Sequence, residues 1–321
     1  MTRGTVIYIG QRLVLIVFTA FAVSSVVFLL LHQIPGNAFT REALHDPAAE
    51  QALLHHYGLD RPLWDQYLSF LGGLLHGDLG ESLVNRGTRI TPLLIHEAEV
   101  SAILGAAALI FTIGVGMVLG VIAAVRQNTW ADYTATTASV IGYSMPNFVI
   151  ATLLVLVTAK LFYIWTNGAF YYEIGWGSGA SIFPKPQQIL VPALALGLPY
   201  ASIVARLTRA SMLETIRQDY VRTAWAKGLE PRLVIIRHAL RNALIPVITI
   251  IGPLTTGIIT GVVVIENIFG IPGLGKEFID SILNRDYNIV IGTFTFFAAL
   301  TGLANLTVDV VYPLIDPRIR Y

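Results

Sequence analysis

The chain has 321 residues, of which 55% are hydrophobic and only 13% are charged. Soluble domains carry about 25% charged residues, so this composition excludes an ordinary soluble protein and indicates one that lies in a lipid bilayer. The formal net charge of +1 says little about partners, and the absence of cysteine excludes disulfide and thiolate chemistry.

Six windows free of Asp, Glu, Lys and Arg are each near or above the length needed to cross a bilayer. About 20 helical residues span roughly 30 Å of hydrocarbon. We therefore predict an all-α integral membrane protein with six transmembrane helices. The first is expected to remain uncleaved, because no A-x-A cleavage pattern follows it. The windows are Leu13–Leu31, Val100–Val125, Tyr133–Ala159, Pro186–Ala205, Asn242–Ile265 and Tyr287–Val308.

The segment between the first two windows, about 32–99, is predicted to lie outside the cell membrane. A helix of about three turns is expected within 47–58, because proline opens it and glycine follows it. A second, amphipathic helix is expected after Pro62, interrupted by the pair Gly72-Gly73. Its apolar face suits either the membrane interface or a partner, and the sequence does not choose. That face comprises Trp64, Tyr67, Leu68, Leu71, Leu74 and Leu75.

Glycine and proline patterns indicate how the windows pack. Two G-x-x-x-G pairs let helix backbones approach closely, and we interpret both as packing within this chain rather than as dimer seams. The pairs are Gly116/Gly120 and Gly257/Gly261. Pro192 and Pro199 predict a short, doubly interrupted fourth helix, which is commoner in transporters than in static anchors. Between the fifth and sixth windows, 266–286 is expected to be an outer loop rich in Gly and Pro.

A basic block, 206–241, lies between the fourth and fifth windows. Short loops rich in Lys and Arg stay on the cytoplasmic side, so we predict that this block and both chain termini are cytoplasmic. The block carries eight cations against three acidic residues. The cations are Arg206, Arg209, Arg217, Arg222, Lys227, Arg232, Arg237 and Arg241.

Within this block, Asp219–Gly228 predicts a short helix. Gly228 supplies a left-handed stop, and Pro231 is expected to prevent the helix from resuming. Helical spacing places four residues on one side: Val221, Ala224, Trp225 and Gly228. A topology anchor on lipid phosphates would explain the charges alone. The organised helix favours docking to a cytoplasmic partner.

Other motifs do not support catalysis or ion coupling. The segment 270–277 matches a phosphate-binding loop except that Glu277 replaces the Ser/Thr that would bind magnesium, so no nucleotide site is expected. Six histidines of the first outer segment lack metal-ligand spacing and are interpreted as solvated. The ionisable residues near the windows, Lys160, Glu266 and Asp309, lie at window edges, where snorkelling or interfacial placement explains them. The driving force is therefore expected to come from another protein.

These residues together resemble ABC importer permeases in their peptide-permease form. Arg222–Gly228 followed by Arg237–Ala243 is similar to the EAA loop of that family, although Arg222, Thr223 and Ala224 stand where the general pattern has Glu-Ala-Ala. Gln127–Thr129 with Asp132–Thr134 resembles the oligopeptide branch. Further matching segments are Pro35–Asn37, Tyr57–Pro62, Gly77–Gly80, Ala205–Ala210, Gly270–Gly275, Asn284–Tyr287 and Asp316–Tyr321.

The resemblance implies a type I permease fold in a single domain, 1–321, in the bacterial inner membrane. It implies a second permease subunit, two cytoplasmic ATPase subunits and an extracytoplasmic peptide-binding protein as partners. This chain would be a non-catalytic subunit without a cofactor, importing oligopeptides. The residues implied to couple it to the ATPases are Asp219, Tyr220, Arg222, Thr223, Ala224, Lys227 and Gly228.

Three alternatives remain open from the sequence. The same type of assembly could import dipeptides, glutathione or a nickel complex. A stand-alone secondary carrier or channel and a structural membrane scaffold are the other two, the scaffold being disfavoured by the broken helices.

Overall fold

The computed structural model describes residues 3–34, 39, 47–168, 175–177 and 184–315, and within them the fold is all-α. An isolated antiparallel bridge joins Glu81 to Arg89. The predicted turn at 35–37 and the terminal motif 316–321 lie outside the described residues. The chain divides into two compact units, 1–101 with 272–303, and 102–271 with 304–321. This division does not test the single permease domain, which stays a prediction.

Among the residues that the structure describes, six helices are long and apolar enough to cross a membrane, which confirms the predicted number of spans. They extend over Ile7–Leu31, Ile90–Val125, Asn147–Trp165, Gln188–Ile216, Ile251–Phe269 and Tyr287–Val310.

The first unit contains helices α1 (Arg3–Leu31), α3 (Pro47–His56), α4 (Leu63–Leu75) and α14 (Leu274–Asn284), with the beginnings of α5 (Ile90–Val125) and α15 (Tyr287–Ile315). Its core gathers apolar side chains from α5, α14, α15 and the preceding loop: Leu79, Ile90, Leu94, Leu274 and Ile289. The buried carboxylate of Asp286 accepts hydrogen bonds from the Ser82 hydroxyl and from the backbone N–H groups of Leu83 and Val84, both 3.2 Å away. This carboxylate holds the loop before α5 against the start of α15.

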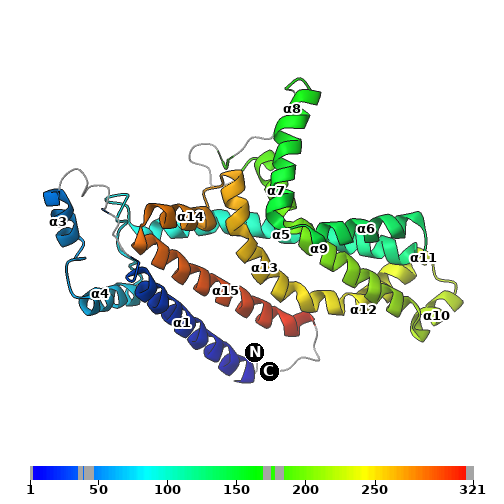
Figure 1. The fold of residues 1–321 in the computed structure, drawn as a ribbon. Helices are drawn as coiled ribbons and strands as arrows, with labels where there is room; N and C mark the ends of the chain where they lie inside the picture. Colours follow the sequence, from blue (N-terminus) through cyan, green and yellow to red (C-terminus); the bar gives the residue numbers. More distant parts are fainter. Residues whose placement is uncertain (1–2, 35–38, 40–46, 169–174, 178–183, 316–321) are drawn as a thin grey trace. The chain divides into compact units, whose positions relative to one another are not determined.

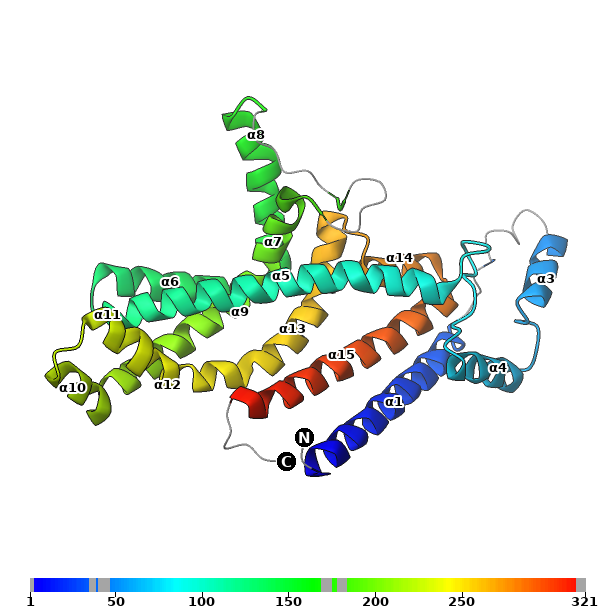
Figure 2. The same ribbon diagram turned by 180° about the vertical axis from the view of Figure 1, so that it is seen from behind.

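The second unit is built around α9 (Pro186–Ile216), which lies alongside α6 (Trp130–Ser144) and α13 (Ile245–Phe269) (Figures 1 and 2). It also contains α7 (Asn147–Val155), the π-helix η1 (Leu156–Leu161) and α8 (Phe162–Trp165). The segment after α9 forms α10 (Asp219–Ala226), α11 (Pro231–Leu233), the π-helix η2 (Val234–Leu240) and α12 (Arg241–Ala243).

The G-x-x-x-G pairs pack within this chain, as predicted. A Cβ added at Gly116 would lie 2.7 Å from the Ala201 carbonyl oxygen of α9, and one at Gly120 would lie 2.6 Å from that of Ala205. The second pair faces α9 as well, because a Cβ at Gly257 would lie 2.8 Å from the Tyr200 hydroxyl. Small residues thus let α5 and α13 approach the backbone and side chains of α9.

Two predictions about the apolar windows are wrong, one about the continuity of the third and one about the length of the fourth. The third window is not one helix but breaks at Met145-Pro146, because a residue before proline is disfavoured in the helical conformation and Met145 takes ψ 131°. The fourth helix is neither short nor interrupted: α9 runs for 31 residues through Pro192 and Pro199. Each proline removes one backbone hydrogen bond, but packing against α6, α7 and α13 holds the helix together.

Three further expectations need correction. The segment 266–286 is largely helical, because α14 forms within it between left-handed residues at Gly270 and Arg285. The pair Gly72-Gly73 does not interrupt α4, which continues to Leu75. Glu266 lies in the last turn of α13, at the end of a span as expected, but its side chain is fully buried, so snorkelling does not describe it.

Candidate functional site

The short helix α10 forms almost as the sequence predicts. Gln218 precedes it in an extended conformation, and Asp219 places a negative charge in its first turn, which complements the helix dipole. The helix stops at Gly228, whose φ is +73°. The expectation that Pro231 prevents a further helix is wrong. Pro231 stands at the first position of α11, where a backbone N–H would have no partner within the helix, so its absence is tolerated.

One face of α10 packs against its own chain. Val221 is 0% exposed and Ala224 is 5% exposed, and both contact the buried Val234 of η2. Trp225 and Gly228, predicted on the same side, are exposed. The buried face is therefore narrower than the helical spacing suggested, and Ala224 does not point outward in this chain.

A side-chain hydrogen bond fixes α10 at a second point. The Asn242 amide donates to the Tyr220 hydroxyl over 2.7 Å, which joins the first turn of α10 to α12. The Thr223 hydroxyl donates to the Asp219 carbonyl oxygen of its own helix over 2.9 Å. The side chains of Tyr220 and Thr223 thus form hydrogen bonds within this chain.

The exposed face of α10 carries charges of both signs. The guanidinium of Arg222 lies 3.7 Å from the Asp219 carboxylate, and their side chains are 71% and 99% exposed. Such an exposed pair contributes little to stability, so both groups are available to a partner. Lys227 and the half-exposed Trp225 extend the same surface.

The segment that follows α10 is seated on the ends of longer helices. Ala239 of η2 and Ala243 of α12 are buried together with Met212 of α9 and Ala124 of α5. A π-helix widens the turn and is frequent at functional sites. Its placement here joins α10 to the two longest helices of the second unit, so α10 is not a free loop.

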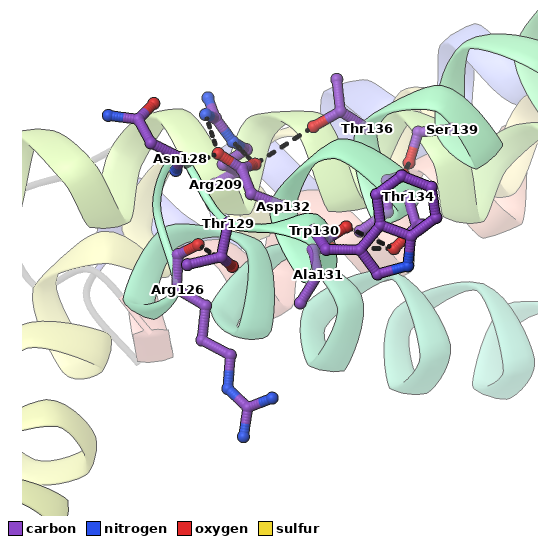
Figure 3. Close-up of polar contacts among 11 residues, drawn as sticks. Arg126, Asn128, Thr129, Trp130, Ala131, Asp132, Thr134, Thr136, Ser139 and Arg209 are labelled. Atoms are coloured by element: carbon purple, nitrogen blue, oxygen red, sulfur yellow. Dashed lines mark hydrogen bonds and ion pairs between the residues drawn. The ribbon is translucent and has the colours of Figure 1, made fainter.

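An ion pair fixes the stretch of α9 that leads into α10 (Figure 3). Nε of Arg209 donates to Oδ1 of Asp132 over 2.6 Å, and Nη2 donates to Oδ2 over 2.8 Å. The Asp132 side chain is 4% exposed, and it also accepts hydrogen bonds from the Asn128 N–H and the Thr136 hydroxyl. The hydrogen bonds from Arg209 lower the pKa of Asp132 from its usual value to about 2.

Sequence reasoning found α10 but missed the residues that hold it. Val234 and Asn242 lie well beyond the helix in the sequence, and no local pattern marks them. Asp132 and Arg209 each stood within a segment similar to peptide permeases, and Arg209 also stood among the cations of the basic block, but neither was singled out. A buried acid in the first turn of a helix facing a distant arginine becomes visible only when α6 and α9 are packed.

The phosphate-loop lookalike has neither the place nor the neighbours of a nucleotide site. It follows the helix α13 rather than a strand, and the Lys276 ammonium pairs with the Asp280 carboxylate one turn later. The Lys276 side chain is therefore engaged within α14.

Comparisons with known proteins agree with this architecture. Residues 116–321 match the family model described as "Binding-protein-dependent transport system inner membrane component". The chain is 40% identical over 316 residues to the dipeptide transport system permease protein DppB of Bacillus subtilis (strain 168), covering 98% of this chain and 97% of that protein. It is also 40% identical over 314 residues to the oligopeptide transport system permease protein OppB of Escherichia coli (strain K12), covering 98% and 99%.

Solved structures show the same fold at low sequence identity. A chain of the inward-facing MetNI methionine ABC transporter superposes with a TM-score of 0.56 at 15% identity, covering 70% of this chain and 96% of that one. A chain of an amino acid ABC transporter superposes with a TM-score of 0.50 at 15% identity, covering 71% and 95%. The six-span all-α fold is thus that of an ABC importer permease, and this chain belongs to the family of binding-protein-dependent transport system inner membrane components.

Proposed function

We propose that this chain is the membrane subunit of an importer for short peptides, with oligopeptides as its substrates. The relatives that it matches over nearly their whole length are named as oligopeptide and dipeptide permeases. Import of dipeptides by the same type of assembly is the second candidate, since the B. subtilis relative carries that name at the same identity. Import of glutathione or of a nickel complex by the same type of assembly is the remaining alternative.

ATP hydrolysis in this proposal takes place in two cytoplasmic subunits that dock on α10. The observation that carries it is the seating of α10: one face is buried against Val234, while charged side chains cover the other. Arg222 and Lys227 would pair with acidic groups of an ATPase subunit, and Ala224 would act by seating the helix. The chain itself would hold neither nucleotide nor cofactor.

The orientation follows from charge. The basic block 206–241 would be cytoplasmic, and six crossings would then place both termini on the same side. A second permease subunit and an extracytoplasmic peptide-binding protein would complete the assembly, in keeping with the binding-protein-dependent family. Binding of ATP and of the loaded binding protein would shift the population between two packings of the helices.

Reconstitution tests the proposed function directly. The chain, co-expressed with its partner subunits and placed in liposomes with a loaded binding protein, is expected to take up a labelled oligopeptide only when ATP is present on the α10 side. Dipeptide uptake measured in parallel separates the two substrate candidates. Uptake by the lone chain in ATP-free vesicles would show a secondary carrier and overturn the proposal.

Gly228 offers a test of the helix stop. Its φ of +73° strains any branched side chain, although no heavy atom lies within 4 Å of an added Cβ. Gly228→Val is expected to lower ATP-dependent uptake several-fold, because the left-handed conformation costs an L-residue about 1–2 kcal/mol. Gly228→Asn, which tolerates this conformation, should transport near the normal rate. Equal uptake by the two variants would show that the left-handed backbone conformation at Gly228 does not matter for transport.

A further inference from the structure

The helix α4 presents a stripe of apolar side chains that the described chain leaves largely uncovered. Residues at i, i+4, i+7 and i+11 share one side of a helix. Here these positions hold Trp64, Leu68, Leu71 and Leu75. Trp64 is 65% exposed, Leu68 48% and Leu75 86%, while Leu71 is half-buried.

A different side of α4 is fixed to the end of α1. The hydroxyls of Tyr67 and Ser25 are 2.7 Å apart, and Nε2 of His32 lies 3.2 Å from Oε1 of Gln66. The ring of Phe28 lies 5.7 Å from that of Phe70. Both views show α4 lying across the end of α1 and pointing away from it (Figures 1 and 2).

These contacts set the depth of α4. They involve the last two turns of α1, whose membrane-spanning stretch ends at Leu31. From Ser25 to Leu31 a helix rises about 9 Å, so α4 meets α1 within about 10 Å of the end of its apolar span. That is the boundary between acyl chains and headgroups, where amphipathic helices bury their apolar face by about 5–10 Å.

The polar side of α4 faces a different environment. Asp65, Ser69 and Gly73 line a cavity of about 420 Å³ together with polar residues of the neighbouring loops, among them Arg61 and Asp78. On a helix, Ser69 lies about 100° from Leu68, so the polar and apolar sides diverge. The three sides of α4 therefore differ: one contacts α1, one lines the polar cavity, and the third exposes the apolar stripe.

We propose that the stripe Trp64, Leu68, Leu71 and Leu75 rests in the lipid bilayer, so that α4 is an interfacial helix at the end of α1. The last turns of α1 also expose apolar side chains, since Val26, Leu29 and Leu30 are 48–57% exposed. Tryptophan in its first turn suits the interface, where aromatic side chains gather. This inference concerns the bilayer alone and does not rest on the transported substrate.

Because this chain has no cysteine, a single introduced cysteine is its only site for a thiol-specific label. Single cysteines at Leu68→Cys and Leu75→Cys, with Ser69→Cys as the matched control on the polar side, are spin-labelled in the full assembly in phospholipid vesicles. Collision rates with oxygen, which concentrates in lipid, and with a water-soluble nickel chelate report the surroundings of each label.

The labels at 68 and 75 are expected to show an oxygen-to-nickel collision ratio several-fold above that at 69. Equal ratios at 68 and 69 would place the stripe in water and overturn the proposal. Protection of 68 from both reagents in the assembly, but not in the lone chain, would identify a protein as the occupant and would overturn it as well. Either result leaves the peptide-import proposal untouched, because that proposal is tested by uptake.

Discussion

Replacing Ala224 by tryptophan is expected to abolish ATP-driven uptake while the chain still inserts in the membrane and assembles. Ala224 is 5% exposed and lies against Val221 and Val234. An indole cannot fit there without displacing α10 from η2, and overpacking of this kind costs about 1–3 kcal/mol. Since 1.4 kcal/mol is a tenfold change in an equilibrium, this cost corresponds to a loss of uptake of roughly fivefold to more than a hundredfold.

Three measurements separate a displaced helix from a failure to fold. Uptake and stimulated ATPase activity are compared in the same vesicles, and limited trypsin digestion reports exposure of the bonds after Arg222 and Lys227. Ala224→Trp should lose stimulation and be cut faster at these bonds. Ala224→Ser, which keeps a small side chain, should behave like the unaltered chain. Normal uptake by Ala224→Trp would refute the role of the seated helix.

The limits of α10 could be predicted because they rest on local signals. An acidic residue at the first turn and Gly228 at the end set the helix without help from the rest of the chain. The number of spans could also be predicted from local sequence, since the length of each apolar window can be counted directly. The buried face of α10 was predicted only in part, because the spacing of Val221, Ala224 and Trp225 does not say which of them turns inward.

What could not be predicted depends on distant contacts. Ala224 is buried in a cluster with Val234, ten residues later in the sequence, and Tyr220 accepts a hydrogen bond from Asn242. The unbroken course of α9 through Pro192 and Pro199 depends on three packed neighbours rather than on its own propensity. Local reasoning missed the helix α14 because Gly270, Pro272 and Gly273, which come just before it, also suit a loop.

The second large effect is expected at the ion pair between α6 and α9. Asp132→Asn keeps the shape of the side chain but removes its charge, which leaves Arg209 with a neutral partner in a site where Asp132 is only 4% exposed. Breaking a buried pair typically costs about 3–5 kcal/mol, and we expect less here because the Arg209 side chain is 29% exposed. Arg209 precedes the end of α9 by two turns, so a loosened pair should alter the course of α9 into α10.

We therefore expect Asp132→Asn to assemble but to hydrolyse ATP with little uptake, which is measured as peptide transported per ATP. The exchange Asp132→Arg with Arg209→Asp should restore part of this ratio, whereas either reversal alone should not. Because the pKa of Asp132 is lowered to about 2, its contribution to stability is fully present above about pH 4 and is lost only as the pH falls toward 2. The defect of Asp132→Asn should accordingly be the same at pH 6 and pH 8. A defect confined to one of these pH values, or an exchange no better than the single reversals, would mean that the charge pair does not set the position of α9.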